Sequence, residues 1–342
     1  MSEDRAAAYS HAWIAAVPKI ELHVHHVGAT SADTVADLAA RHPESGVPTD
    51  PSALEEFYRF TDFDHFLQVY AAISRLLSTP EDVYRLTVGN LADLAAQHVR
   101  YVEMTVTPNG ILTGGVPREG LVEALDAARA AAARDWDLTV NWILDIPAFT
   151  GEPAEVVMDL CEQRQPAGLV ALGLGGPETP RADFAAYFGR ARALGLGSVP
   201  HAGEASGPES IRAALQVLKA DRIGHGIRAV EDPAVLVELA DAGVHLEVSP
   251  TSNVRTRVVQ TYEDHPLPTL LAAGVPVSIN SDDPPMFGTT LTRELQIAAQ
   301  LVGSEQIPRF LRNAIGASFA SDTVKRSYLA ELADAETHAR DG

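Results

Sequence analysis

The sequence predicts a (β/α)8 TIM barrel with a helical insertion after the first strand and a C-terminal helix. Three observations lead to this fold class. Short apolar runs alternate with Ala- and Leu-rich stretches, eight such runs occur, and most are separated by the length of one βα unit. No low-complexity tract or long charge run divides the 342 residues, so we expect residues 1–342 to form a single domain.

The eight expected strands are short and rich in apolar residues. In order along the chain they are Lys19–His25, Val99–Thr105, Leu138–Leu144, Leu169–Gly173, Gly197–His201, Arg222–Gly226, His245–Val248 and Val275–Ser281. Pro200 lies inside the fifth run, where it would remove one donor from the strand ladder. A bulge or a strand end is therefore expected at that position.

One connection is too long for a simple crossover. The segment 30–98, between the first two strands, carries several helix signals, and we interpret it as a helical insertion that lids the barrel mouth. Thr79 followed by Pro80, Glu81 and Asp82 is typical of an N-cap and a first helical turn. Residues 62–77 predict another amphipathic helix, and residues 321–339 predict a C-terminal helix packed outside the barrel.

Composition excludes several classes of function. With 26 Lys and Arg against 46 Asp and Glu, the formal charge is −20, which argues against a nucleic-acid or anionic-membrane surface. The single cysteine, Cys161, excludes a disulfide framework and a multi-cysteine zinc site. No apolar run is long enough to span a membrane, and the acidic start Met1–Asp4 does not resemble a signal peptide. We therefore expect a cytoplasmic protein.

Histidine and aspartate residues mark the ends of four expected strands. His23 and His25 are two residues apart on the first strand, so both side chains face the same side and can reach one metal ion. An isolated pair of this kind is more often a buried strand feature. Here, however, His201, His225 and the pair Asp282-Asp283 also end strands, and barrel enzymes carry their catalytic groups at those ends.

Imidazole and carboxylate ligands without thiolates favour zinc. Binuclear barrel hydrolases commonly bridge two ions with a modified lysine on a middle strand, whereas the only lysines here, Lys19, Lys219 and Lys325, lie outside the fourth strand. We therefore expect one Zn2+ per chain.

Seven motifs, in order and across almost the whole chain, resemble the adenosine deaminase family. They are Pro18–Ala29, Leu169–Glu178, His201–Glu204, Arg222–Gly226, Ser249–Asn253, His265-Pro266 and Val275–Gly288. This resemblance implies hydrolytic removal of the 6-amino group from a purine nucleoside, on a barrel that holds a single zinc ion. The expected partner is a free small molecule, and no nucleic acid or membrane.

The resemblance also assigns roles to individual residues. The implied zinc ligands are His23, His25, His201 and Asp282. In the matching positions, His225 would orient the attacking water and accept its proton, Glu204 would protonate purine N1, Asp283 would contact N7, and the backbone N–H of Gly176 would contact N3. The residues expected to be catalytic are Glu204, His225 and Asp282, and those expected to bind substrate are Gly176, Asp283, His25 and His26.

The sequence departs from the family pattern where the ribose would lie. Val27 stands where the family carries an acidic residue that contacts the ribose 5′-hydroxyl, and Thr105, Gly173 and Pro177 also replace charged residues. A substrate modified at the 5′ carbon fits this change. Family members with a similar opening motif are linked to 6-amino-6-deoxyfutalosine, an adenosine derivative with a 5′-linked benzoate, in menaquinone biosynthesis. The candidate partners for a benzoate are His26, Arg59 and Arg75.

Three other functions remain open at this point. The first is an adenosine or adenine deaminase of purine salvage. The second is a metal-dependent barrel hydrolase for a non-purine ring or an amide, against which Glu204, Asp283 and Gly176 speak because they match purine nitrogens. The third is a non-catalytic binding relative, which the complete set of metal and acid–base residues disfavours.

Overall fold

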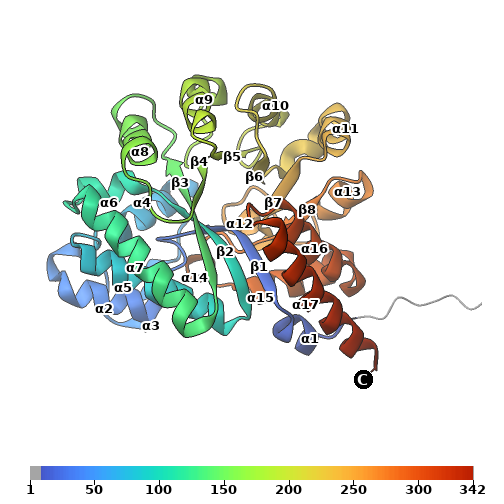
Figure 1. Ribbon diagram of the computed structural model, residues 1–342, viewed down its shortest axis with the longest axis horizontal. Helices are drawn as coiled ribbons and strands as arrows, with labels where there is room; N and C mark the ends of the chain where they lie inside the picture. Colours follow the sequence, from blue (N-terminus) through green and yellow to red (C-terminus); the bar gives the residue numbers. More distant parts are fainter. Residues whose placement is uncertain (1–8, 342) are drawn as a thin grey trace, which may run out of the picture.

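The computed structural model describes residues 9–341, so the acidic start Met1–Asp4 lies outside the described residues. Eight parallel strands form a barrel in which each strand pairs with the next along the chain (Figure 1). The expected fold class is confirmed. The strands are β1 (Lys19–His25), β2 (Val99–Val106), β3 (Thr139–Ile146), β4 (Leu169–Leu174), β5 (Gly197–Ala202), β6 (Arg222–His225), β7 (His245–Val248) and β8 (Val277–Ile279).

The barrel closes where the first strand meets the segment after the last one. Val24 and Asp282 form a parallel bridge, and the His25 N–H donates to the Asp282 carbonyl at 2.9 Å. In return, the Asp282 N–H donates to the carbonyl of His23, also at 2.9 Å. The seam of the barrel therefore includes three of the residues that the sequence predicts as metal ligands, His23, His25 and Asp282.

Helices surround the strands, and most of them cover the outer face of the barrel (Figure 1). The helices of the described residues are α1 (His11–Ala16), α2 (Ala32–Arg41), α3 (Pro51–Phe57), α4 (Phe63–Ser74), α5 (Pro80–Ala96), α6 (Pro108–Thr113), α7 (Arg118–Trp136), α8 (Glu152–Gln163), α9 (Ala185–Ala193), α10 (Pro208–Gln216), α11 (Pro233–Ala242), α12 (Pro250–Arg255), α13 (Leu267–Ala272), α14 (Pro284–Phe287), α15 (Leu291–Val302), α16 (Ile307–Ala317) and α17 (Asp322–Asp341). Strands covered in this way are buried on both faces, and their apolar residues alternate with buried polar and charged ones.

The segment between β1 and β2 is helical, as expected. One of its long helices lies in the outer ring, and another reaches the barrel mouth. Thr79 and Asp82 form the capping box that starts α5, which packs against α7 in the outer ring. The helix expected over residues 62–77 is α4, and its aromatic side chains reach the barrel mouth. At the other end of the chain, α17 lies beside α1, where Trp13 Nε1 donates to the carbonyl of Ala335 at 2.9 Å (Figure 1).

Pro200 ends a ladder and forms no bulge. It pairs in register with Leu174, the last residue of β4, and the following residue, His201, pairs with Gly224 of β6. The missing donor therefore coincides with the change of partner strand, which explains why proline is tolerated there.

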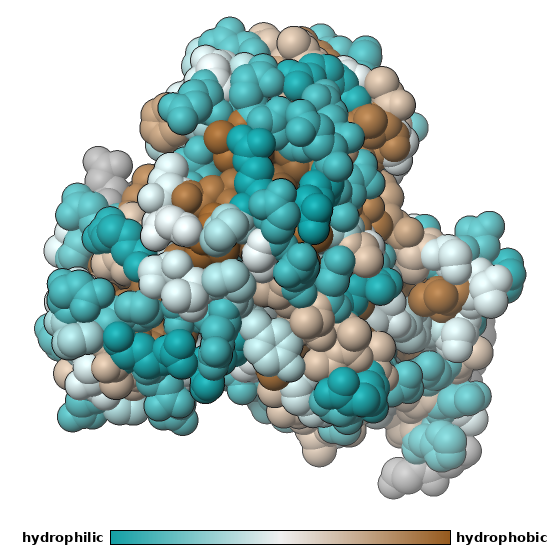
Figure 2. All heavy atoms as spheres, turned by 60° about the vertical axis from the view of Figure 1, so that its left-hand side comes forward, coloured by the Kyte–Doolittle hydropathy of each residue, from teal (hydrophilic) through white to brown (hydrophobic). Residues whose placement is uncertain are grey.

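The face shown in Figure 2 is mostly hydrophilic, with smaller apolar areas between polar side chains. This agrees with the acidic composition. Among the helices of the described residues, none combines the length and the apolar character that a membrane crossing requires.

Candidate metal centre and active site

A cavity of about 330 Å³ opens at the carboxyl ends of the strands, a volume within the range of small-molecule sites. Its inner end contains imidazole and carboxylate groups, and its outer wall is aromatic. The lining residues used below are His25, Phe63, Phe66, Tyr70, Thr107, Asp145, Phe149, Gly175, Gly176, His201, Glu204, His225, Asp282, Asp283 and Phe287. No lysine or arginine lines the cavity within the described part of the chain.

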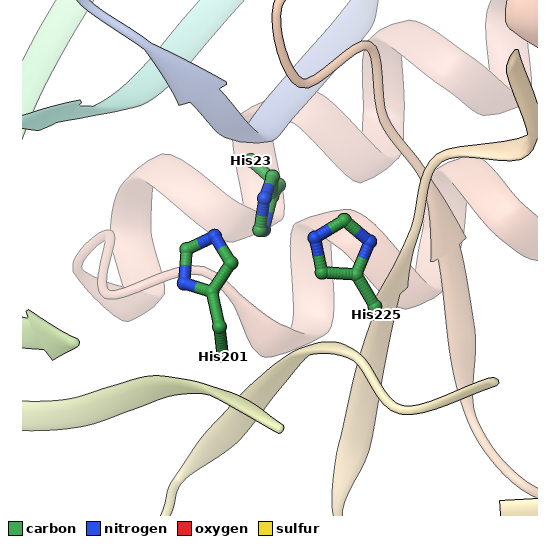
Figure 3. A group of neighbouring side chains, drawn as sticks. All are labelled: His23, His201 and His225. Atoms are coloured by element: carbon green, nitrogen blue, oxygen red, sulfur yellow. The ribbon is translucent and has the colours of Figure 1, made fainter. Parts of the chain in front are cut away.

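Histidines from three strands converge at the inner end. Figure 3 shows the rings of His23 on β1, His201 on β5 and His225 on β6 turned toward a common centre. The ring centroids of His23 and His201 are 4.6 Å apart, and those of His23 and His225 are 4.9 Å apart. The positive φ of His225, 63°, is uncommon for a residue other than glycine and helps to direct this ring inward.

The ring nitrogens face one another in a way that fits a bound cation. His25 Nε2 lies 3.2 Å from His201 Nε2 and 3.3 Å from Asp282 Oδ1. His23 Nε2 has no hydrogen-bond partner among residues 9–341 and lies 3.6 Å from Asp282 Oδ1. Burial lowers the pKa of His25 to about 4, so its ring is neutral and a nitrogen lone pair is available. Ligand atoms of His23, His25 and Asp282 lie within 4.8 Å of one another, as do those of His23, His201 and His225.

A buried network of charged side chains contacts Nδ1 of His23, the ring nitrogen on the side away from Asp282. Glu247 Oε2 on β7 lies 2.9 Å from His23 Nδ1, and its other oxygen accepts from Arg222 Nε on β6 at 2.5 Å. Arg222 also donates to Glu103 of β2 at 2.5 Å. Although burial lowers the pKa of His23, the nearby carboxylates of Asp282 and Glu247 hold it well above its usual value. The same negative groups that favour a proton on this ring favour a metal cation at Nε2.

His225 is oriented by a directed hydrogen-bond chain. The backbone N–H of Leu267 can only donate, and it donates to His265 Nδ1 at 3.1 Å. His265 Nε2 therefore carries the ring proton and donates to Asn253 Oδ1 at 3.1 Å, which leaves the Asn253 amide nitrogen to donate to His225 Nδ1 at 3.3 Å. In the neutral ring of His225 the proton consequently lies on Nε2, which faces Asp282 and Glu204.

This arrangement bears on the expected role of His225. Burial lowers its pKa to about 3, so the ring is neutral at physiological pH. His225 Nε2 lies 3.8 Å from Asp282 Oδ2 and 3.6 Å from Glu204 Oε2. With Nδ1 already accepting a hydrogen bond, His225 acts as a donor toward the cavity in this tautomer, whereas the sequence suggested a proton acceptor.

Glu204 follows β5 on a loop that another carboxylate holds in place. Both oxygens of Glu178 accept hydrogen bonds from this loop, including the backbone N–H groups of Glu204 and Ala205 at 2.7 Å and of Gly203 at 2.9 Å. Burial raises the pKa of Glu204 to about 8, and the nearby negative charges of Asp282 and Glu178 act in the same direction. Glu204 is therefore protonated at neutral pH and can donate.

Asp283 and Gly176 both line the cavity. Burial, together with the adjacent charge of Asp282, raises the pKa of Asp283 well above its usual value, so this carboxyl group can also donate. The position requires glycine at residue 28, because a Cβ there would lie 1.5 Å from Asp283 Oδ1. Gly176, with φ +80°, lines the cavity after β4.

The structure does not bring the expected residues for the 5′ end into the cavity. His26 is fully buried outside the lining, where its Nε2 lies 2.7 Å from Thr87 Oγ1 of α5. His26 is the first residue after β1, and its ring packs against α5 instead of entering the cavity. Arg59 is exposed and paired with Glu56 at 2.9 Å, and Arg75 is exposed beyond α4. The expectation that His26 binds substrate is therefore wrong, because its ring lies outside the cavity.

Sequence reasoning missed four residues that shape the site. Glu247 and Asp145 lie in or at the end of buried strands, and an acidic residue inside an apolar run is a signal that could have indicated them. Glu178 and Asn253 lie within motifs that carried the family resemblance, yet the sequence assigns neither a contact. Their partners are distant along the chain, so only the folded structure reveals them.

Comparison with known proteins places this chain in a family. The family model described as Adenosine deaminase matches residues 18–335. An aminodeoxyfutalosine deaminase from Streptomyces avermitilis is 47% identical over 329 residues, covering 94% of this chain and 92% of its own length.

Solved structures agree with this assignment. The crystal structure of an adenine deaminase from Arthrobacter aurescens has 34% identity and a TM-score of 0.88, covering 93% of this chain and 99% of its own. A zinc-bound amidohydrolase from Burkholderia ambifaria has 26% identity and a TM-score of 0.88, covering 100% of this chain and 95% of its own. The chain belongs to the adenosine deaminase family and is a hydrolytic deaminase.

Proposed function

We propose that the chain binds one zinc ion and hydrolytically deaminates 6-amino-6-deoxyfutalosine, releasing ammonia, as a step of menaquinone biosynthesis. The observation that carries the reaction is the pair of buried carboxyl groups, Glu204 and Asp283, which line the cavity beside the histidine cluster and whose raised pKa values favour the protonated form. The ring nitrogens N1 and N7 of a 6-aminopurine are both acceptors, so each requires a donor. Two carboxyl groups with raised pKa values supply these donors in one cavity.

The proposed metal ligands are His23, His25, His201 and Asp282, whose ring nitrogens and carboxylate oxygens converge. A zinc ion held there would supply Lewis acidity that makes water nucleophilic near neutral pH. The buried network of Glu247 fixes the orientation of His23 toward this point.

The other residues act on the purine and on the water. Glu204 donates its proton to N1, which makes C6 electrophilic, and Asp283 donates to N7. The N–H of Gly176 is proposed to contact N3. His225 donates from Nε2 and thereby orients the attacking water, because Asn253 occupies its other nitrogen. Together these contacts recognise three edges of the ring.

The outer wall supports a substrate that is bulky and apolar at the 5′ carbon. Phe63, Phe66, Phe149 and Phe287 line this part of the cavity and offer flat apolar surface for a benzoate ring. Val27, in the position where the family carries an acid, is 3% exposed and cannot accept a hydrogen bond from a 5′-hydroxyl. Similarity to the Streptomyces avermitilis enzyme supports the same substrate.

Ammonia release from a panel of 6-aminopurines tests this proposal. The panel contains 6-amino-6-deoxyfutalosine, 5′-methylthioadenosine, 5′-deoxyadenosine, adenosine and adenine, each assayed with zinc-loaded enzyme. We expect the highest kcat/KM with 6-amino-6-deoxyfutalosine and loss of activity in Glu204→Gln. A higher kcat/KM with adenosine or adenine would instead identify a purine salvage enzyme, which the similarity to an adenine deaminase makes the second candidate.

A further inference from the structure

Asp145, at the end of β3, is a buried carboxyl group that the proposed mechanism does not use. It lines the cavity, is only 2% exposed, and its Oδ1 has no hydrogen-bond partner among residues 9–341. Its Oδ2 lies 3.4 Å from the hydroxyl of Thr107, at the end of β2. Burial raises the pKa of Asp145 to about 7. A buried acceptor without a donor is costly, so its presence calls for a partner.

The neighbouring strand makes room for this carboxyl group. Asp145 and Gly173 are register partners in the β3–β4 ladder. A Cβ at Gly173 would lie 2.7 Å from Asp145 Oδ1, and a Cβ at Gly175 would lie 2.6 Å from Oδ2. The departure of Gly173 from the family pattern is therefore coupled to the presence of Asp145: an aspartate at position 173 would collide with this carboxylate. Gly173 and Gly175 together leave the space that the Asp145 carboxyl group occupies.

The topology places Asp145 across the barrel from the histidine cluster. The expected metal ligands and His225 come from β1, β5, β6 and the segment after β8, which are centred on β7. In a ring of eight strands in sequential order, β3 lies opposite β7. A purine with C6 toward the histidines, N1 toward Glu204, and N7 toward Asp283 has N9 on the far side, toward β2 and β3.

The chemistry of this far side suits a sugar. Thr107 and Tyr70 also line it, and the Tyr70 hydroxyl has no hydrogen-bond partner within the described chain. A carboxylate and two hydroxyl groups pair well with hydroxyl donors, whereas a phosphate would meet the negative charge of Asp145 and no lining lysine or arginine. The sugar directly attached to N9 is therefore recognised through its hydroxyl groups.

We propose that Asp145 is a specificity-determining residue whose unpartnered oxygen accepts a hydrogen bond from a ribose hydroxyl of the substrate. This inference rests on the proposed deamination of a nucleoside and adds the contact that separates a nucleoside from its free base. Gly173 and Gly175 are positioning residues in this scheme, because they admit the carboxylate without touching the substrate.

The test combines deletion of the carboxylate with deletion of each hydroxyl. Zinc-loaded wild type and Asp145→Ala are assayed with adenosine and with its two analogues that each lack one hydroxyl group, 2′-deoxyadenosine and 3′-deoxyadenosine. We expect Asp145→Ala to lower kcat/KM for adenosine by about 10- to 100-fold, mostly through KM, because a charge-assisted hydrogen bond is lost. For the deoxy analogue that lacks the bonded hydroxyl, the variant and the wild type should have equal kcat/KM.

Three further measurements keep the outcomes distinct. Asp145→Asn, which keeps a neutral acceptor, should lose less than Asp145→Ala. Asp135→Asn removes the same charge from an exposed position and should match wild type. Zinc content and melting temperature check that each variant is folded.

Equal losses on all three nucleosides would overturn the role of Asp145 while leaving the deaminase assignment intact. A wild type that deaminates adenine and no nucleoside would overturn the proposed function itself, and the Asp145 role with it.

Discussion

Replacing Arg222 by methionine should destabilise the barrel and weaken the metal site together. Arg222 is 1% exposed and donates to Glu247 and Glu103, each at 2.5 Å. Both carboxylates are fully buried, so removing the guanidinium leaves two buried charges without their arginine partner. Breaking a buried ion pair of this kind costs about 3–5 kcal/mol of unfolding free energy.

The surface offers a matched control for this substitution. Arg100 also binds two acids, Asp137 at 2.7 Å and Glu331 at 3.4 Å, but its side chain is 30% exposed. Water can replace these contacts, so Arg100→Met should cost about 0–1 kcal/mol. Arg222→Met combined with Glu247→Gln should recover part of the stability, because one of the stranded charges is removed.

The metal readout separates this network from an ordinary core defect. Arg222 is the largest factor lowering the pKa of Glu247, which lies at about 2 despite burial. Without Arg222 the pKa of Glu247 rises, and the hydrogen bond that orients the His23 ring weakens. We expect zinc affinity to fall by about 10- to 100-fold, measured by competition with a chelator. Urea denaturation followed by tryptophan fluorescence measures stability. Equal urea midpoints for Arg222→Met and Arg100→Met would refute the reasoning.

Four other outcomes are expected. The kcat should be constant around neutral pH and fall above pH about 8, because Glu204 acts in its protonated form and burial raises its pKa to about 8; a pH–rate series checks this. Gly28→Ala should lower kcat/KM by about 100-fold by displacing Asp283, whereas Gly189→Ala, with open space around the added Cβ, should not. Asn253→Leu should reduce kcat strongly without changing zinc content, because the tautomer of His225 is no longer fixed; unchanged kcat would contradict the hydrogen-bond chain. Dialysis against a chelator should abolish activity and lower the melting temperature, and added zinc should restore both.

The barrel could be predicted from sequence because its signals are local and repeated. All eight strands were found, since each is a short apolar run, and the start of α5 followed from the Thr79–Asp82 box. The histidines at strand ends were predicted to converge because parallel strands share one edge, and the structure brings them together. Alternation along a strand and order around a barrel require no knowledge of side-chain packing.

Other parts of the site depend on contacts that sequence does not encode locally. The carboxylate of Glu178 meets a loop 25 to 28 residues further along the chain, and Asn253 links His225 to His265 through one amide. His26 was misplaced because a charged or imidazole side chain next to a metal motif looks functional, whereas its ring packs on Thr87 of α5. His26 lies in the turn after β1, so neither its direction nor the helix that covers it follows from the strand pattern.

The seam between Val24 and Asp282 has a consequence for how the protein matures. The site combines residues of the first strand with residues that follow the last strand, so a ribosome must complete most of the chain before these residues can meet. A nascent or truncated polypeptide that lacks the Asp282 segment still carries His23, His25 and His201, but it has neither a closed ring of strands nor the carboxylate. Metal capture in the native geometry would then follow barrel closure, and full-strength binding would report that synthesis of the barrel is complete.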